Sequence, residues 1–164
     1  MNKIKRLTKP EYICYLALAA SSRAEDIHTR VGGVIVNKDW RVLNTAFNGW
    51  KPGMKMPEKF LLNENRTEKG KHIIHCEQNL FNFHHDIPYA LGLTISPCSS
   101  CSDTIKANNI KEVYYIKEYE RDEKKEFKDK FDFYGIKYRT LTKEEISNIL
   151  FFMEKDRNSL IELL

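Results

Sequence analysis

Two short segments constrain this chain more than any other feature, because their side chains can share a metal ion only if the fold brings them together. The first is His75-Cys76-Glu77 and the second is Pro97-Cys98-Ser99-Ser100-Cys101. One histidine and two cysteines supply three ligands for zinc and leave a fourth coordination position open, as in catalytic zinc sites. Glu77 is not needed as a ligand and is free to transfer protons. We therefore predict one zinc ion per chain, with Glu77 as the catalytic residue and with the metal ligands His75, Cys98 and Cys101.

A structural zinc knuckle is the alternative interpretation, and it requires a fourth protein ligand. The candidates for that ligand are Cys76, His72 and His84. Adjacent residues near a helix start point about 100° apart, which disfavours Cys76 as a ligand beside His75. A redox Cys-x-x-Cys is disfavoured by the His-x-Glu upstream. The pattern therefore favours a catalytic site.

The order of apolar runs and cap signals predicts a layered fold. Thr8 and Glu11 form a capping box, and Thr142 and Glu145 form another. Strands that alternate with helices imply crossover connections, while an opening hairpin makes part of the sheet antiparallel. We predict a three-layer α/β/α fold with a five-stranded mixed sheet. The expected helices are 8–22, 75–87, 98–108, 123–134 and one from residue 142; the expected strands are 31–36, 41–47, 89–95, 113–116 and 136–141; and residues 48–71 are expected to form a loop.

Length and charge limit the class of protein. A chain of 164 residues is most simply a single domain, here residues 1–164. No apolar run approaches the roughly 20 residues that span a bilayer, and no hydrophobic signal core follows the basic N-terminus, so we predict a cytoplasmic protein with no membrane partner. The formal charge of +4 suits an anionic small molecule and is too weak to indicate a nucleic-acid partner.

The residues around the zinc ligands resemble a known family. His-x-Glu with Pro-Cys-x-x-Cys is the signature of zinc nucleobase deaminases. Val31-Gly32-Gly33-Val34-Ile35-Val36, Ala46-Phe47-Asn48-Gly49, His75-Cys76-Glu77-Gln78-Asn79 and Ser96-Pro97-Cys98 together resemble the deoxycytidylate (dCMP) deaminases, over roughly residues 10 to 140. The resemblance implies a cytidine-deaminase-like fold and the zinc-dependent hydrolysis of dCMP to dUMP and ammonia, which supplies thymidylate synthesis.

The resemblance also implies roles for matching positions. Asn48 is expected to hydrogen-bond the sugar at its 3′-hydroxyl, and the backbone amide of Cys76 to meet the pyrimidine carbonyl. The carbonyl of Ser96 is expected to accept from the amino group that leaves, and Tyr119 to lie near the base and phosphate. The family usually has alanine at the position of Cys76 and tyrosine at that of Phe47.

A 5′-phosphate needs a cationic partner. Arg30 ranks first because it lies at the entrance to a strand near Asn48. The other candidates are Lys51, Arg66, Lys69 and Lys71.

The resemblance further suggests regulation by dCTP and dTTP, with Mg²⁺ accompanying a nucleoside triphosphate effector. The expected effector residues are Gly49, Lys51 and Gly53. Members of the family are commonly homo-oligomers, either dimers or hexamers. Two other functions remain open: a deaminase of tRNA adenosine or of another cytosine nucleoside, and a non-catalytic zinc domain that binds deoxynucleotides.

Overall fold

The computed structural model describes residues 6–26, 28–55, 57–60, 66–82, 84–120 and 125–163. Its middle layer is a five-stranded sheet in the order β2-β1-β5-β6-β7. β1 pairs antiparallel with β2 and β5, whereas β5, β6 and β7 run parallel. The predicted mixed sheet is therefore confirmed. The strand bounds are β1 Gly32–Val36, β2 Val42–Phe47, β5 Ala90–Ile95, β6 Glu112–Lys117 and β7 Lys137–Thr140.

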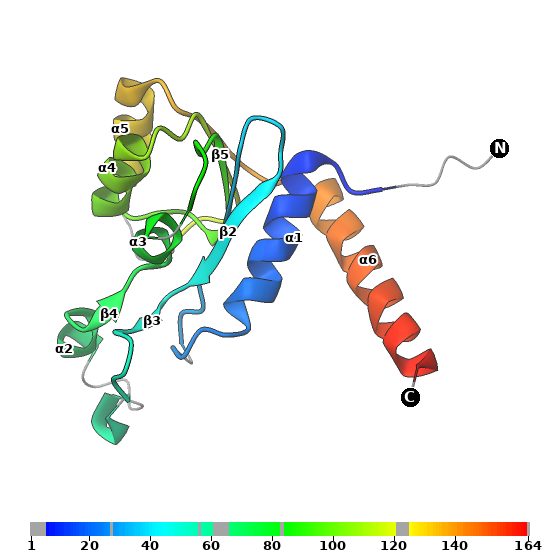
Figure 1. Cartoon of the computed structure of the whole chain (residues 1–164), viewed down its shortest axis with the longest axis horizontal. Coiled ribbons are helices and arrows are strands. Elements are labelled where there is room, and N and C mark those ends of the chain that lie inside the picture. Colours follow the sequence, from blue (N-terminus) through cyan, green and yellow to red (C-terminus); the bar gives the residue numbers. More distant parts are fainter. Residues whose placement is uncertain are drawn as a thin grey trace.

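Helices cover both faces of this sheet, as predicted (Figure 1). One face carries α1 (Lys9–Ser21) and α6 (Lys143–Glu162), and the other carries α3 (Cys76–Phe81), α4 (Ser99–Ala107) and α5 (Glu126–Tyr134). In the part of the chain that the structure describes, no helix is long and apolar enough to cross a membrane.

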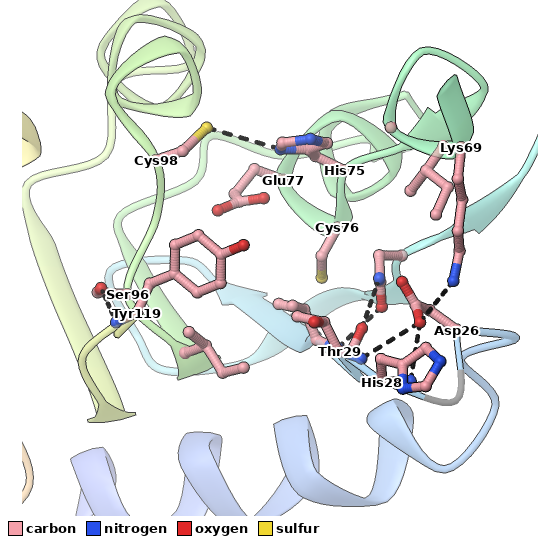
Figure 2. Close-up of a pocket in the computed structure, with 15 residues that line it drawn as sticks. Asp26, His28, Thr29, Lys69, His75, Cys76, Glu77, Ser96, Cys98 and Tyr119 are labelled. Carbon is pink, nitrogen blue, oxygen red and sulfur yellow. Dashed lines mark hydrogen bonds and ion pairs between the residues drawn. The ribbon is translucent and has the colours of Figure 1, made fainter. Parts of the chain in front are cut away.

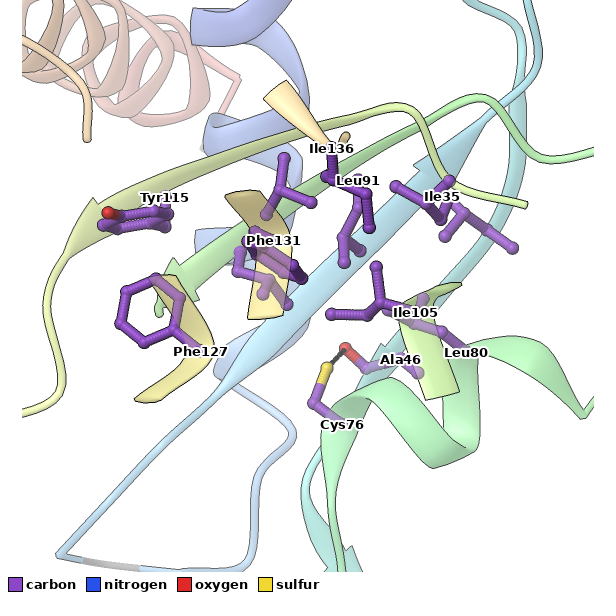
Figure 3. Packing of buried hydrophobic residues seen from close by; sticks show 13 residues of the cluster. Ile35, Ala46, Cys76, Leu80, Leu91, Ile105, Tyr115, Phe127, Phe131 and Ile136 are labelled. Carbon is purple, nitrogen blue, oxygen red and sulfur yellow. Dashed lines mark hydrogen bonds between the residues drawn. The ribbon is translucent and has the colours of Figure 1, made fainter. Parts of the chain in front are cut away.

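Successive side chains of β1 point to opposite faces of the sheet, so this strand contributes to the hydrophobic core on both faces. Ile35 points into the cluster under α3, α4 and α5, whereas Val34 and Val36 pack against Ile13 of α1. All three valine and isoleucine side chains of β1 are fully buried. This burial on both faces explains why the strand reads as a continuous apolar run in the sequence. Figure 3 shows the larger cluster, in which Phe127 and Phe131 of α5 lie against the sheet.

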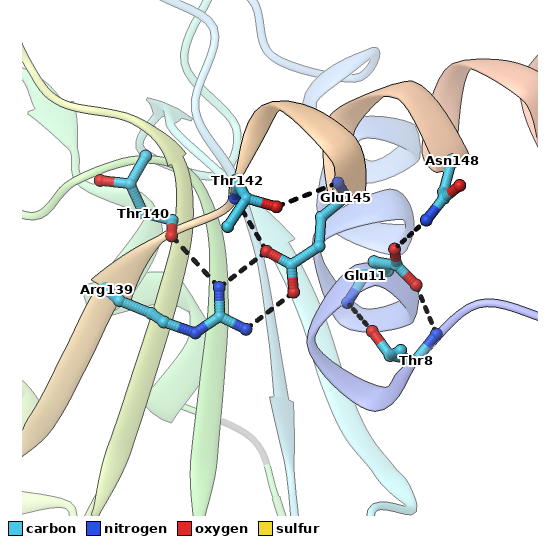
Figure 4. Close-up of polar contacts among 7 residues, drawn as sticks. All are labelled: Thr8, Glu11, Arg139, Thr140, Thr142, Glu145 and Asn148. Carbon is cyan, nitrogen blue, oxygen red and sulfur yellow. Dashed lines mark hydrogen bonds and ion pairs between the residues drawn. The ribbon is translucent and has the colours of Figure 1, made fainter.

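Both predicted capping boxes are present, and side chains link them to the rest of the fold. Arg139 of β7 donates to both carboxylate oxygens of Glu145, at 2.7 and 2.8 Å. Asn148 donates to Glu11 at 2.7 Å and so joins α6 to α1 (Figure 4). The Arg139 guanidinium holds the pKa of Glu145 below its usual value.

The prediction of a plain loop over residues 48–71 was wrong. The segment contains β3 (Gly49–Trp50), a 3₁₀ turn at Glu58–Phe60 and α2 (Arg66–Gly70), and β3 pairs antiparallel with β4 (Ile73–Ile74). Trp50 stacks on Phe60 and His72, with ring centroids 5.4 and 5.9 Å apart. Contacts between aromatic side chains that are distant in sequence stabilise this segment. Because such contacts do not recur at a regular spacing, the sequence of the segment shows no helical or strand period.

Two helix boundaries also differ from the prediction. The helix expected to end just before Pro88 ends at Phe81, and α5 begins at Glu126 instead of 123; residues 121–124 lie outside the described part of the chain. After α3, Asp86 accepts from the Asn37 side chain at 2.7 Å and from the Ile87 amide at 2.7 Å. These contacts hold the chain against the β1–β2 hairpin in a non-helical turn.

Replacing Gly32 by alanine is expected to destabilise the fold, because α1 lies directly against β1 at this position. A Cβ at Gly32 would be 2.0 Å from the Ala17 carbonyl oxygen and 2.5 Å from the Ser21 nitrogen. Both are backbone atoms, so we expect a loss of about 1–3 kcal/mol in the free energy of unfolding. Urea denaturation measures the loss, with Gly70→Ala as control, because a Cβ there meets nothing within 4 Å. Equal losses in the two variants would contradict this packing.

Candidate active site

The three predicted zinc ligands meet between two helix starts. His75 lies at the N-cap of α3, directly after β4, and Cys98 lies at the N-cap of α4 with Cys101 in its first turn. His75 Nδ1 is 3.3 Å from Cys101 Sγ and 3.6 Å from Cys98 Sγ. All three ligand atoms lie within 4.8 Å of one another. This is a distance at which one ion can contact all three.

The donor set suits zinc, since two sulfurs and one imidazole nitrogen are ligands that zinc prefers. Hydrogen bonds from Cys101, His75 and Ser100 lower the pKa of the Cys98 thiol to about 3, with that from Cys101 the largest cause. The hydrogen bond to Cys98 in turn raises the pKa of Cys101, and so does burial. Cys98 is therefore ready to bind a cation as a thiolate. Cys101 would have to lose its proton to bind a metal ion.

Glu77 lies in the first turn of α3, and only 4% of it is exposed. Burial is the main cause that raises the pKa of its carboxyl group, and the nearby Cys98 adds to the rise. A raised pKa brings a carboxyl group closer to the range in which it can both take and give a proton at neutral pH. In Figure 2 the Glu77 carboxylate points into the pocket beside the metal ligands.

Cys76 points away from the metal ligands. Its Sγ donates to the Ala46 carbonyl at 3.3 Å, within the hydrophobic core (Figure 3). The other candidates for a fourth ligand lie elsewhere: His72 stacks on Trp50, and His84 contacts the Asp86 carbonyl at 2.9 Å. The arrangement therefore favours a site with three protein ligands over a structural knuckle.

A pocket of about 200 Å³ opens beside these ligands (Figure 2). Its walls come from the segment between α1 and β1, the end of β2, the α2–β4 segment, the start of α3, the end of β5 and the segment after β6. The lining residues are Asp26, His28, Thr29, Val31, Asn48, Lys69, Gly70, Ile73, His75, Cys76, Glu77, Ile95, Ser96, Cys98 and Tyr119.

Four of the five predicted substrate residues line this pocket, namely Asn48, Cys76, Ser96 and Tyr119. The Asn48 side chain accepts from the Val31 amide and donates to the Thr29 carbonyl, both at 2.8 Å. The Ser96 hydroxyl accepts from the Tyr119 amide at 2.9 Å. Asn48 thus holds the segment before β1, and the Ser96 hydroxyl holds the backbone of Tyr119.

Of the phosphate candidates, Lys69 lines the pocket, whereas Arg30, Lys51 and Lys71 are not in the lining. Arg30 is exposed, and its backbone carbonyl accepts from the Thr94 hydroxyl of β5 at 3.5 Å. Lys51 and Gly53 are exposed on the turn after β3. Gly49 pairs with Ile74, and Gly53 has a φ of +81° that favours glycine. The side chain of Arg66 lies outside what the structure describes.

Sequence reasoning missed Asp26, His28 and Thr29 as pocket residues. Asp26 accepts from the backbone amides of His28 at 2.8 Å and Thr29 at 3.2 Å. An aspartate often accepts hydrogen bonds from the backbone amides two and three residues later in a turn, and this local signal could have been read from the sequence. Its place in the pocket, however, depends on the α2 segment beside it.

The sheet, the two helix starts and the three-ligand group with a buried carboxylate together define a zinc-dependent deaminase domain. A family model described as the cytidine and deoxycytidylate deaminase zinc-binding region matches residues 7–117. The chain belongs to this family.

Curated relatives carry the same family name. A probable deoxycytidylate deaminase of Caenorhabditis elegans is 29% identical over 117 residues, which are 67% of this chain and 58% of the relative. The deoxycytidylate deaminase of Homo sapiens is 24% identical over 138 residues, which are 79% of this chain and 78% of the relative. The chain thus spans just over half of the nematode protein and most of the human one.

Solved structures confirm the fold. The dCMP deaminase from the cyanophage S-TIM5, in complex with dCMP and dUMP, matches with a TM-score of 0.62 and 23% identity over 80% of this chain and 95% of that one. RibD of Acinetobacter baumannii matches with a TM-score of 0.58 and 16% identity over 82% of this chain and 35% of that one. Because proteins of different names share the fold, the substrate must be argued from the pocket.

Proposed function

We propose that this protein catalyses the hydrolytic deamination of dCMP to dUMP and ammonia, and so supplies thymidylate synthesis. The observation that carries the proposal is the group of His75, Cys98 and Cys101 beside the buried Glu77, at the wall of a pocket. The deoxycytidylate deaminases among the curated relatives support the choice of substrate.

The residues of the pocket have distinct roles in this reaction. Zinc held by His75, Cys98 and Cys101 would activate a water molecule as the nucleophile at neutral pH. Glu77 takes one proton from the attacking water and passes it to the ring nitrogen beside the carbon under attack. It then takes the proton of the hydroxyl group added to that carbon and gives it to the departing amine, which leaves the ring carbonyl and ammonia. Its burial keeps bulk water from competing for that proton. The Cys76 amide meets the pyrimidine carbonyl and the Ser96 carbonyl accepts from the amino group, which orients the ring.

Asn48 and Tyr119 bind the remainder of the nucleotide. The Asn48 amide makes one backbone contact with each of its two polar atoms. An amide oxygen accepts two hydrogen bonds and an amide nitrogen donates two, so one of each is left for the sugar 3′-hydroxyl. Tyr119 lines the same pocket from the segment after β6, where its ring can contact the base.

A substrate panel tests the proposal. Zinc-loaded protein is incubated with dCMP, deoxycytidine, dCDP, CMP and a tRNA anticodon stem-loop while ammonia release is measured. We expect dCMP to have the highest kcat/KM. Turnover of the RNA alone would show a tRNA adenosine deaminase, and inertness toward every compound despite dCMP binding would show a non-catalytic nucleotide-binding domain.

Regulation by dCTP and dTTP is a further part of the proposal, with Mg²⁺ accompanying the triphosphate. The expected effector residues Gly49, Lys51 and Gly53 lie in or after β3, and β3 pairs with β4, which ends one residue before His75. An effector bound at this turn could therefore shift a metal ligand through two strands. Repeating the dCMP assay with each triphosphate tests this link.

We also propose a single domain that works in the cytoplasm. Segments before and after the zinc motifs contribute strands to one sheet, which supports one domain. Four free cysteines, two of them close together, suit a reducing compartment.

A second copy of the chain is the proposed partner of α6. This helix exposes several large apolar side chains, and Figure 1 shows its C-terminal end lying away from the sheet. An isolated helical end is marginal in water, so an apolar partner would stabilise it. Glu154, Lys155, Asp156 and Arg157 place both charge signs close together, which lets two antiparallel copies complement each other. The exposed large apolar residues of α6 and its C-cap are Leu150, Phe151, Met153, Leu160, Ile161 and Leu163.

Charging this helix is expected to dissociate the oligomer. Leu160 and Ile161 are 63% and 55% exposed, so replacing both by glutamate leaves the folded chain intact but disfavours burial against a partner. Sedimentation velocity should show a fall to the monomer mass. Phe133→Glu is the control, since Phe133 is 87% exposed on α5, on the other face of the sheet. A wild type that is already monomeric, or a double variant with unchanged mass, would contradict the interface.

A further inference from the structure

Lys69 is the one lysine or arginine among the described residues that line the pocket. It comes from α2, and only 5% of its side chain is exposed. Its Nζ lies 2.8 Å from Asp26 Oδ1. Figure 2 shows this pair on the side of the pocket away from Cys98 and Tyr119. A buried lysine with one carboxylate partner is uncommon and therefore calls for an explanation.

Asp26 is well suited to hold that lysine in place. The same Oδ1 atom accepts from Lys69 and from the amides of His28 and Thr29. Burial raises the pKa of Asp26, but the hydrogen bonds from Lys69 and from these amides outweigh it and lower the pKa below its usual value. The carboxylate therefore stays ionised and joins α2 to the segment before β1.

The Lys69 ammonium has hydrogen-bonding capacity left over. A lysine carries three N–H donors, and Asp26 uses one of them. The remaining two lie on a buried side chain at the pocket wall, where an unmet donor is costly. An anionic group with several acceptor oxygens at this end of the pocket would satisfy both donors.

We propose that Lys69 binds the 5′-phosphate of the substrate and that Asp26 positions Lys69 for this contact. The inference rests on the proposed function, since a nucleotide with its base at the zinc ligands carries its phosphate at a distance from them. Lys69 thereby replaces Arg30, which is exposed and outside the lining. Lys71 is exposed as well and pairs with Glu68 at 2.8 Å.

Kinetics with a nucleotide and its nucleoside test this assignment. Lys69→Met keeps the length of the side chain but removes the charge, so kcat/KM for dCMP should fall about 10- to 100-fold, through KM. For deoxycytidine, which has no phosphate, kcat/KM should stay within about threefold of wild type, since only the charged contact is lost. Lys69→Arg keeps a cation and should retain most of the preference for dCMP. Lys71→Met is the matched control and should behave as wild type.

Two results would overturn the assignment. If Lys69→Met lowers kcat/KM for dCMP and deoxycytidine equally, the ion pair only holds the pocket wall together. If Arg30→Met and not Lys69→Met removes the preference for dCMP, the phosphate lies at Arg30. Melting temperatures of the variants show that each is folded.

Calorimetric binding separates this inference from the proposed function, because it requires no turnover. Zinc-loaded wild type and Lys69→Met are titrated with dCMP and with deoxycytidine. If the protein fails to deaminate dCMP, the proposed function is wrong, yet a dCMP preference in binding that Lys69→Met abolishes would still support the phosphate contact. Equal affinity of wild type for the two compounds would overturn it.

Discussion

Replacing Glu77 by glutamine is expected to lower kcat for dCMP by about 10²–10⁴-fold or more, while zinc content stays near one ion per chain. Glutamine keeps the size and hydrogen-bonding shape of the buried side chain but cannot take up a proton. Ammonia release measures the first effect, and elemental analysis of the purified variant measures the second. Because Glu77 is not a member of the three-ligand group, the two effects should separate.

Glu68→Gln is the matched control for this variant. Glu68 is an exposed carboxylate at the α2 end of the same region, it pairs with Lys71, and it does not line the pocket. Its loss should leave both activity and zinc content unchanged. Loss of zinc in Glu77→Gln would instead make Glu77 a ligand, and equal activity of wild type and variant would leave the non-catalytic domain as the better interpretation.

Replacing Cys98 by alanine is expected to remove the zinc and all activity. The variant keeps only two of the three ligands, and a site with two protein ligands binds zinc too weakly to survive purification. The free energy of unfolding should also fall, since a metal at 1,000 times its Kd stabilises the folded state by about 4 kcal/mol. Zinc analysis and scanning calorimetry, with and without a chelator, measure these losses.

Cys76→Ala is the control within the same motif. The Cys76 sulfur lies in the core and donates to the Ala46 carbonyl, away from the ligand group. Its removal leaves the backbone amide in place, so zinc content and turnover should persist with a loss of about 1 kcal/mol in stability. If Cys76→Ala loses its zinc as Cys98→Ala does, the site is a four-ligand structural one.

The zinc ligands and the sheet could be predicted from the sequence because their signals are local. Cys98 and Cys101 are spaced within one helical turn. Thr8 and Glu11, three residues apart, form a capping box that predicts the start of α1. Strand β1 is apolar throughout because both of its faces are buried. Each of these patterns depends only on near neighbours in the chain.

The pocket wall could not be predicted in the same way. Trp50 meets Phe60 and His72 across a segment without a helical or strand period, and the early end of α3 depends on contacts of Asp86 with Asn37. Arg30 ranked first for the phosphate because it is close in sequence to a strand. The tertiary structure shows instead that Arg30 is exposed and does not line the pocket.

The sequence by itself determined the chemistry: a histidine, two cysteines and a glutamate at spacings that suit one zinc ion and one proton-transfer group. The tertiary structure decided which charged side chains line the pocket. Lys69 and Asp26 are far apart in the chain, and they pair because α2 packs beside the segment before β1. Ligand spacing within a helical turn is a local property, whereas the burial of an ion pair depends on every element that excludes water from it.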